Sequence, residues 1–279
     1  MRVWAGIRSG FVIPVLAVCL LLIATLAVAQ SGSALMRLSD RDDLLGWEAV
    51  GRLDMAGTGF CTGTLIAADL VLTAAHCVFD RRTGKVLQPE RITFRAGLRD
   101  GISVAERKAL QIVVPPDYVP LSGFTLDNVR RDVALLRLDR AIVSTDADPF
   151  VLYSGSSPGG DVSVASYGKG RSGAISRQRQ CRVLASQNDL MMFDCNVTFG
   201  SSGAPVFTRY GNRGRIISVI SGMARVDGQK VALGMSLPRV VAALKAQMRR
   251  NPVTRPLGEI RRIRVGSSNR VSGARFIKP

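Results

Sequence analysis

Histidine is nearly absent from this chain of 279 residues, because His76 is the only one. Cysteine is also scarce, with five residues and no C-x-x-C spacing. A zinc site of the common kind needs several such ligands at close spacing, so the composition argues against one. The sequence also contains no internal repeat, no glycine-rich phosphate loop and no dinucleotide fingerprint. We therefore expect a protein that works without a metal or an organic cofactor.

Acidic residues are few as well, since 21 Asp and Glu stand against 38 Lys and Arg, for a net charge of +17. The excess is uneven, because residues 249–279 contain nine Lys or Arg and one acid, Glu259. A net positive charge affects what a protein associates with and does not determine its fold, so this charge suggests an anionic partner. This tail has one aromatic residue, Phe276, and no readable motif, which disfavours nucleic acid. We interpret residues 249–279 as a largely disordered basic tail, either simply solvated or attracted to an anionic envelope or cell-wall surface.

One long hydrophobic run is present, and it lies at the N-terminus, at residues 11–28. Two arginines precede the run, and Ala27 and Ala29 occupy the A-x-A positions of a cleavage site. This arrangement predicts a signal peptide over residues 1–29 and export to the periplasm or the extracellular space. The run is also long enough to span a bilayer, so a membrane anchor formed by residues 11–29 is the alternative.

Removal of the signal would leave four cysteines: Cys61, Cys77, Cys181 and Cys195. An even number of cysteines in an exported chain predicts two disulfides. Four cysteines allow three pairings, and the short-range one, Cys61 with Cys77 and Cys181 with Cys195, closes two loops of similar modest size. Each bridge would stabilise the fold by roughly 3 kcal/mol through loop-closure entropy.

The chain between Trp47 and Ser236 consists of short apolar or alternating runs separated by Gly, Pro, Asp and Asn, a pattern typical of many strands. Eleven runs are candidate strands: FCTGTLI, LVLTA, RITFRA, LQIVV, DVALLRL, DVSVASY, QRQCRVL, LMMFDCNV, APVFTRY, RIISVISG and VALGMSL. Their number and spacing favour barrels or a sandwich. A Pro- and Gly-containing stretch at residues 144–161 is the expected boundary between two lobes.

One amphipathic helix is predicted, over the sequence LPRVVAALKAQMRR near the end of the body. Pro238 stands near its start, and Val240, Val241, Leu244 and Met248 form an apolar stripe along one face. Lys and Arg gather toward its C-terminus, where they complement the helix dipole. We expect this helix to close the folded body.

Three short motifs follow one another along the chain: TAAHC with His76, DVALLRL with Asp132, and GSSGAP with Ser202. In their order and in their residues these motifs resemble those of the trypsin and chymotrypsin-like serine proteases. GSSGAPVF is more similar to the bacterial glutamyl-endopeptidase-like members. A cysteine directly after the histidine, with another sixteen residues before it, belongs to the same resemblance. The resemblance covers residues 47–248 and leaves residues 30–46 as a separate N-terminal segment.

This resemblance implies an all-β fold of two antiparallel β-barrel lobes with a C-terminal helix, and the activity of a serine endopeptidase acting on peptides or proteins. A serine hydroxyl is a poor nucleophile at neutral pH, so Ser202 would need His76 as its base. Asp132 would accept the other ring N–H and hold the tautomer. The backbone N–H groups of Gly200 and Ser202 would form the oxyanion hole.

The sequence departs from the family where a zymogen ion pair would form. Ser201 stands where digestive members carry Asp, and no Ile-Val-Gly-Gly sequence lies near residues 30–50. Counting back from Ser202 places Asn196 at the base of the specificity pocket, where trypsin-like members carry Asp. Ser221 and Met223 would lie along the substrate strand, and no second histidine is present to favour glutamyl substrates. The competing hypothesis is a non-catalytic homologue that binds polyanions.

Overall fold

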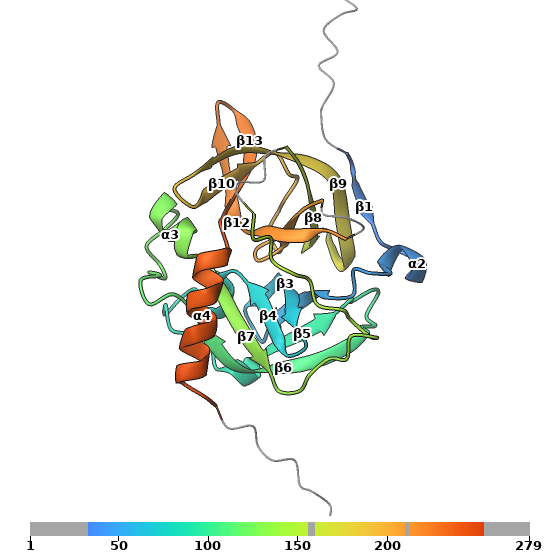
Figure 1. Ribbon diagram of the computed structural model, residues 1–279, viewed down its shortest axis with the longest axis vertical. Helices are drawn as coiled ribbons and strands as arrows, with labels where there is room; N and C mark the ends of the chain where they lie inside the picture. The colour runs from blue at the N-terminus through green and yellow to red at the C-terminus, as the bar shows by residue number, and fades with distance from the viewer. Residues whose placement is uncertain (1–32, 156–159, 210–212, 254–279) are drawn as a thin grey trace, which may run out of the picture.

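The structure is a computed structural model that describes residues 33–155, 160–209 and 213–253. The predicted signal peptide and all but the first few residues of the predicted tail lie outside these ranges. Figure 1 shows two sheet-built lobes stacked on each other, with the C-terminal helix α4 (Pro238–Arg250) running along the side of one of them. The predicted all-β architecture of two antiparallel barrels with a C-terminal helix is confirmed.

The first lobe is a closed six-stranded barrel in the order β2-β3-β4-β7-β6-β5, with every neighbouring pair antiparallel. Its strands are β2 (Val50–Met55), β3 (Gly59–Ala67), β4 (Leu70–Thr73), β5 (Ile92–Ala96), β6 (Ala105–Val113) and β7 (Ala134–Leu138). Apolar side chains alternate inward along these strands, as in Ile92, Phe94 and Ala96 of β5, which are buried while Thr93 and Arg95 are not.

The second lobe contains the strands β8-β9-β10-β13-β12-β11, and it closes because β9 also pairs with β8. Its strands are β8 (Asp161–Gly168), β9 (Arg171–Gln187), β10 (Leu190–Phe193), β11 (Pro205–Thr208), β12 (Arg215–Val226) and β13 (Gln229–Met235). The long strand β9 makes this closure, because its first half pairs with β8 and its second half with β10. A seventh strand, β1 (Leu35–Arg37), adds to β9 from the N-terminal segment.

A continuous hydrophobic core joins the two lobes. Trp47 packs at ring-centroid distances of 5.7 Å from Phe150 and 5.3 Å from Phe207, and Phe150 lies 4.6 Å from Phe207. Phe207 belongs to the second barrel, whereas Phe150 comes from the connection between the barrels. The shared core fixes the lobes against each other, so a site built from both can keep one geometry.

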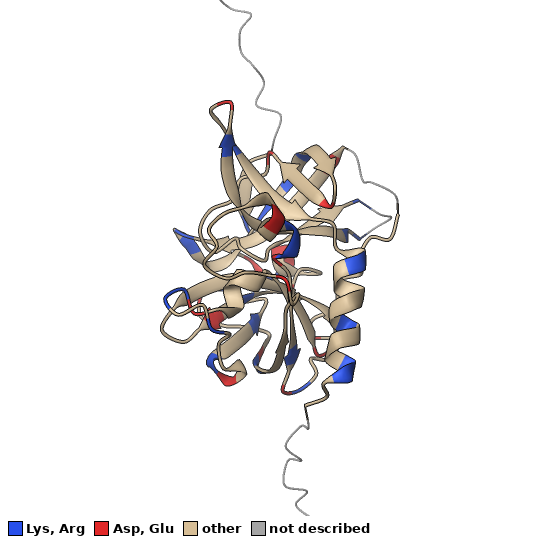
Figure 2. Ribbon diagram, turned by 90° about the vertical axis from the view of Figure 1, so that its left-hand side faces the viewer, with Lys and Arg blue, Asp and Glu red and all other residues tan. Residues whose placement is uncertain are grey.

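Helix α4 packs against the first barrel through the predicted stripe, with Val241, Leu244 and Met248 buried and Val240 partly buried. Figure 2 marks Lys and Arg positions along this helix, and three of them, Arg239, Arg249 and Arg250, are exposed. Two shorter helices were not predicted: α2 (Arg41–Leu44) and α3 (Leu126–Arg131), the latter capped by Thr125, whose hydroxyl accepts from the Asn128 N–H. No helix in the described part of the chain is long and apolar enough to cross a membrane.

Candidate active site

His76 and Asp132 meet at one end of the first barrel. His76 lies in a short 3₁₀ helix, Ala75–Val78, that begins just after β4, and Asp132 directly follows α3. The His76 Nδ1 lies 2.7 Å from Asp132 Oδ2, and the backbone N–H of His76 donates to Asp132 Oδ1 at 2.8 Å. Because the carboxylate is hydrogen-bonded to both the ring and the backbone of His76, the imidazole plane has little freedom to turn.

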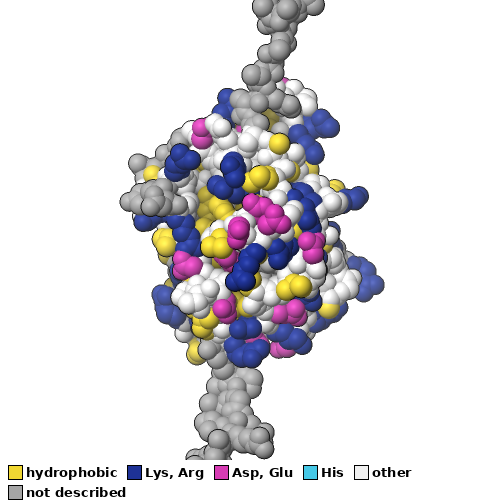
Figure 3. Space-filling model, turned by 90° about the vertical axis from the view of Figure 1, so that its right-hand side faces the viewer, with side chains coloured by type: hydrophobic (Ala, Val, Ile, Leu, Met, Phe, Trp, Pro, Cys, Tyr) yellow, Lys and Arg dark blue, Asp and Glu magenta, His cyan; other side chains and the backbone are white. Residues whose placement is uncertain are grey.

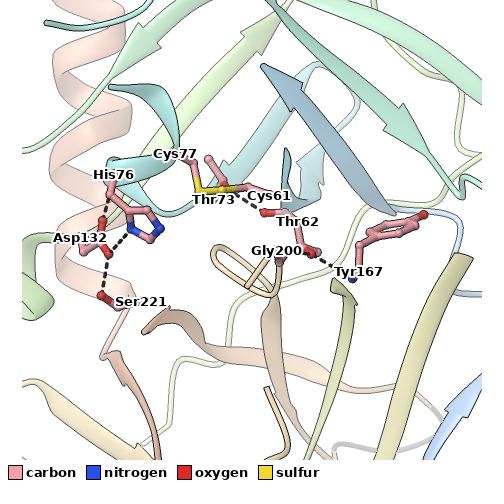
Figure 4. Close-up of a disulfide and its surroundings, with 9 residues drawn as sticks. All are labelled: Cys61, Thr62, Thr73, His76, Cys77, Asp132, Tyr167, Gly200 and Ser221. Carbon is pink, nitrogen blue, oxygen red and sulfur yellow. Dashed lines mark hydrogen bonds and ion pairs between the residues drawn. A yellow bond between two sulfur atoms is a disulfide. The ribbon is translucent and has the colours of Figure 1, made fainter. Parts of the chain in front are cut away.

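Ser221 in β12 is the third donor to this carboxylate, since its hydroxyl lies 2.6 Å from Asp132 Oδ2. Figure 4 shows Asp132 between His76 and Ser221, with all three contacts drawn. Asp132 is only 3% exposed, so its charge depends on these donors in place of water. An ionised Asp132 makes Nδ1 the protonated ring nitrogen and leaves Nε2 as the proton acceptor.

Ser202 sits in a tight turn that two glycines make possible. Gly200 has φ +92° and Gly203 has φ +76°, values that side-chain-bearing residues rarely adopt. Space is lacking too, because a Cβ on Gly203 would lie 2.1 Å from Thr73 Oγ1 and a Cβ on Gly200 would lie 2.3 Å from the Phe60 ring. Both glycines are therefore required for the backbone to reach this position.

The backbone N–H groups of this turn fall into two sets. Those of Ser201 and Gly203 donate to Thr198 and Ile220 carbonyls at 2.9 Å and 2.7 Å. Within the described residues, the N–H groups of Gly200 and Ser202 donate to no protein acceptor. These two N–H groups are thus without a partner among the described residues, and an oxyanion hole needs two such unpaired donors.

Thr62 in β3 connects the serine turn to the first barrel, a role that its sequence context, an ordinary strand threonine, does not indicate. Its hydroxyl donates to the Gly200 carbonyl at 2.9 Å, and its own N–H donates to the Ser202 carbonyl at 2.9 Å. The neighbouring Cys61 forms a disulfide with Cys77, which follows His76 in the chain. One short stretch of β3 therefore contacts both the histidine segment and the serine turn (Figure 4).

Ser201 is held by a buried polar network in which Arg171 is the cation. The Arg171 guanidinium donates to Ser201 Oγ at 3.1 Å, to Ser166 Oγ at 2.9 Å and to the Ser166 carbonyl at 2.5 Å. Ser201 Oγ also lies 3.2 Å from the Tyr167 carbonyl and accepts from the Thr198 N–H at 3.3 Å. Burial lowers the pKa of Arg171. The position where digestive family members place Asp is thus anchored from within the chain.

A cavity of about 480 Å³ connects these groups, and its lining comes from both barrels and from the α3 region. The lining includes His76, Asp132, Ser202, Ser221 and Met223, five of the residues predicted for the site. Its other members are Arg81, Tyr118, Gly123, Phe124, Thr125, Asn128, Val129, Val197, Thr198, Phe199, Ile220 and Gly222. Burial, and then the charge of Asp132, raises the pKa of the Tyr118 phenol, which therefore stays neutral here.

Gly200 does not line this cavity, and neither does Asn196, the residue predicted at the base of the specificity pocket. Its side chain is exposed, and its backbone N–H donates to Gln178 Oε1 at 2.7 Å. Val197 and Thr198 line the cavity instead. The place of Asn196 at the base of the specificity pocket stays a prediction, and the adjacent Cys195 is bonded to Cys181 of β9.

The second predicted disulfide, Cys181 with Cys195, is present along with the first. In the described part of the chain, one group of side chains has the spacing of a metal site, with the Cys61, His76 and Cys77 ligand atoms all within 4.8 Å of one another. Both sulfurs of that group are bonded to each other. Since thiolates bind metals and a disulfide is not a thiolate, an intact bridge leaves His76 free for proton transfer.

Sequence relatives of this chain are proteases. Residues 57–213 match the family model described as the trypsin-like peptidase domain. The chain is 31% identical to serine protease 23 of Rattus norvegicus over 193 residues, which are 60% of this chain and 49% of that protein. It is 28% identical to serine protease SP24D of Anopheles gambiae over 180 residues, 62% of this chain and 60% of that one. The chain thus spans about half the length of the serine protease 23 relatives.

The fold is similar to that of a solved Glu endopeptidase determined in complex with MPD. The TM-score is 0.64, and the match covers 80% of this chain and 99% of that one at 17% sequence identity. At this level of identity the likeness concerns the fold alone, which is chymotrypsin-like.

Proposed function

The chain belongs to the trypsin-like peptidase family, and from this premise we propose that it is a serine endopeptidase with His76, Asp132 and Ser202 as its catalytic triad. The observation that supports this most directly is the carboxylate of Asp132, which is buried and bonded to His76 Nδ1 at 2.7 Å in a cavity that Ser202 also lines. A buried Asp that orients a histidine beside an accessible serine is the arrangement that hydroxyl activation needs.

In the proposed reaction Ser202 Oγ attacks the carbonyl carbon of the scissile peptide bond, and His76 Nε2 takes the hydroxyl proton. The N–H groups of Gly200 and Ser202 donate to the oxyanion of the tetrahedral intermediate. The C–N bond then breaks as His76 returns the proton to the leaving amine, and an acyl-enzyme remains. Water, activated by the same histidine, hydrolyses the ester and restores Ser202. Asp132 stays ionised throughout and stabilises the imidazolium.

In the same proposal the enzyme needs no new N-terminus for activity. Ser201 carries no charge that could bind an amino terminus, and Arg171 already holds it through a hydrogen bond of 3.1 Å. A chain that begins at Gln30 should therefore hydrolyse peptides at the same rate as one with extra residues ahead of Gln30. Extension is the better test than truncation, because β1 pairs with β9 and its removal would disturb the fold. Strict dependence on one cleaved N-terminus would contradict this route.

The proposal includes export, with removal of residues 1–29, and two disulfides support an oxidising destination. Residues 249–279 are proposed to attract the enzyme to an anionic envelope or cell-wall surface. Deletion of these residues should release the protein from that surface in low salt, where the attraction is least screened. Unchanged association of the deleted chain would refute this part.

Labelling with a fluorophosphonate probe tests the triad, because the probe reacts with an activated serine. We expect mass mapping to find the label on Ser202, and both Ser202→Ala and His76→Ala to abolish it. Ser144→Ala, an exposed serine between the barrels, is the matched control and should label normally. A folded, disulfide-bonded protein that takes no label at Ser202 would instead favour the non-catalytic, polyanion-binding homologue.

A further inference from the structure

A second cavity, of about 1040 Å³, lies apart from the catalytic one and shares no lining residue with it. Its walls come from β8, β9 and β11 and from the segments that precede β2 and β12. It opens on the side of the molecule where β1 and α2 lie, the side that Figure 3 shows, on which Lys and Arg side chains border exposed hydrophobic ones. Four arginines line it, and we name it the arginine cavity after Arg177, Arg179, Arg209 and Arg213.

Aromatic rings form the base of the arginine cavity and hold two of its guanidinium groups in place. Arg177 Cζ lies 4.1 Å from the centroid of the Trp47 ring, and Arg213 Cζ lies 4.3 Å from that of Phe150. Cation–π contacts of this kind fix the planes of the guanidinium groups but leave their N–H donors unsatisfied. Arg177 therefore presents oriented donors without a protein acceptor to match, whereas Arg213 donates to the Asp148 carbonyl and pairs with its carboxylate.

The charges of the cavity are poorly neutralised. Within the described residues, the Arg177 guanidinium makes no hydrogen bond or ion pair, and its Nε is buried without an acceptor. Burial lowers the pKa of Arg177, and the neighbouring charges of Arg179 and Arg209 lower it further. Arg179 and Arg209 are exposed and make no ion pair with a described residue. The positive charges of Arg177, Arg179 and Arg209 thus disfavour one another, while the counter-charges of Asp148 and Glu48 act on Arg213.

The acids of this region do not balance the arginines. Asp161 is the one acid in the lining, and it accepts a hydrogen bond of 2.7 Å from Gln180 Nε2. Asp148 pairs with Arg213, but the Nε of Arg213 is still without an acceptor. The sequence segments 30–32, 156–159 and 210–212, which adjoin lining residues along the chain, contain no Asp or Glu.

We propose that the arginine cavity is a binding site for a phosphate-bearing ligand. The planar fork of a guanidinium matches two phosphate oxygens, and charge-assisted hydrogen bonds of this kind are about twice as strong as neutral ones. A phosphate group between Arg177, Arg179 and Arg209 would accept from the unsatisfied donors and remove the mutual repulsion. The volume leaves room for more than one phosphate, as in a diphosphate, and the ligand is either a soluble phosphate compound or a phospholipid headgroup.

Calorimetric titration of the purified protein with inorganic pyrophosphate at low ionic strength tests the proposal. We expect saturable binding at one site, and an affinity reduced at least about tenfold in the double variant Arg179→Gln/Arg209→Gln, since each charged hydrogen bond lost weakens binding. Arg249→Gln/Arg250→Gln is the matched control, because it removes the same charge from exposed positions at the end of α4. Absence of saturable binding, or equal weakening in both variants, would overturn the proposal.

A second arm separates the two sources of phosphate. Vesicles of phosphatidylglycerol that compete with pyrophosphate, and that Arg179→Gln/Arg209→Gln binds more weakly than Arg249→Gln/Arg250→Gln does, would identify a lipid headgroup. Pyrophosphate binding without competition from these vesicles would identify a soluble ligand. Peptide hydrolysis should be unchanged in both double variants, because neither touches the catalytic cavity. Failure of the proposed peptidase function would therefore leave this test intact.

Discussion

The two cavities of this protein differ in how their buried charges are partnered. In the cavity of the candidate active site, Asp132 accepts from His76 twice and from Ser221, and the nearby Arg171 donates to three acceptors. In the arginine cavity, the half-buried Arg177 lies on Trp47 and donates to no described residue. The first arrangement is complete within the chain and suits preorganised chemistry, whereas the second is complete only with an anion from outside.

The largest effect is expected from a substitution of Asp132, the residue at the centre of the hydrogen-bond network with His76 and Ser221. Asp132→Asn keeps the shape of the side chain but can present an N–H to His76 Nδ1, which would favour the wrong tautomer. We expect kcat for peptide hydrolysis to fall about 10⁴-fold. Urea unfolding of the variant serves as the control for folding. A fall of less than about tenfold would show that Asp132 does not hold the tautomer.

A matched pair of substitutions compares the two arginines directly. Arg171→Met removes the hydrogen bonds that the guanidinium donates to Ser166 and Ser201 in a buried site. It should therefore lower the free energy of unfolding by about 1–3 kcal/mol. Arg177→Met keeps the contact with Trp47 but removes an unpaired charge, so it should leave that free energy unchanged or raise it. Urea unfolding followed by fluorescence measures both. Equal losses in the two variants would remove the distinction between the cavities.

Loss of Arg171 should also slow catalysis, because Ser201 precedes the nucleophile and its N–H lies between the two free ones. We expect a reduced kcat with little change in KM for Arg171→Met, and an unchanged kcat for Arg177→Met. A purely structural role for Arg171 would lower stability alone.

A smaller effect is expected from Ser221→Ala, which removes one of the three donors to Asp132 and leaves His76 in place. Loss of one hydrogen bond to a buried carboxylate should reduce kcat about tenfold. Ser221→Thr retains the hydroxyl and is the matched variant that should recover part of the rate. Full activity of Ser221→Ala would indicate that the two contacts from His76 are sufficient to hold the carboxylate.

The smallest effect concerns the apolar wall of the catalytic cavity. Phe124 lines the cavity from the loop before α3 and is 55% exposed, so Phe124→Ala should cost little stability. Loss of its contact with substrate should raise KM about fivefold and leave kcat unchanged, since about 1 kcal/mol of apolar contact is removed. Steady-state kinetics with peptides of varied sequence measure the change. A fall in kcat instead would place Phe124 closer to the chemistry.

All eleven strands predicted from local pattern are strands in the structure, whereas β1 and β2 were not predicted. In β2, Gly51 interrupts the alternation of apolar side chains, so the period is weak even though the strand is central to the first barrel. The three residues of β1 have no pattern of their own and form a strand because β9 offers an edge to pair with. Local periodicity cannot predict a strand that forms only because a neighbouring strand offers an edge for pairing.

The residues of the candidate site also fall into two groups, those that the sequence predicted and those that it did not. His76, Asp132 and Ser202 stand in recognisable motifs, so the sequence predicted them, and the structure places them around one cavity. Arg171 and Thr62 have no such motif, because an arginine among 38 basic residues and a strand threonine look ordinary. Asn196 was predicted by counting along the chain, and it lies outside the cavity lining because the path of the backbone, set by its neighbours, decides which residues face inward.

The sequence by itself determined the strand-rich fold class and the C-terminal helix, because both are encoded in short-range spacing, and its motifs indicated the chemical character of the candidate site. Only the tertiary structure decided which charges are satisfied. Arg171 and Arg177 are six residues apart on the same strand, yet one faces Ser201 and the other faces Trp47. The free energy of a buried charge depends on neighbours that are distant in sequence, so folding alone places one arginine beside the serine turn and the other in an open cavity.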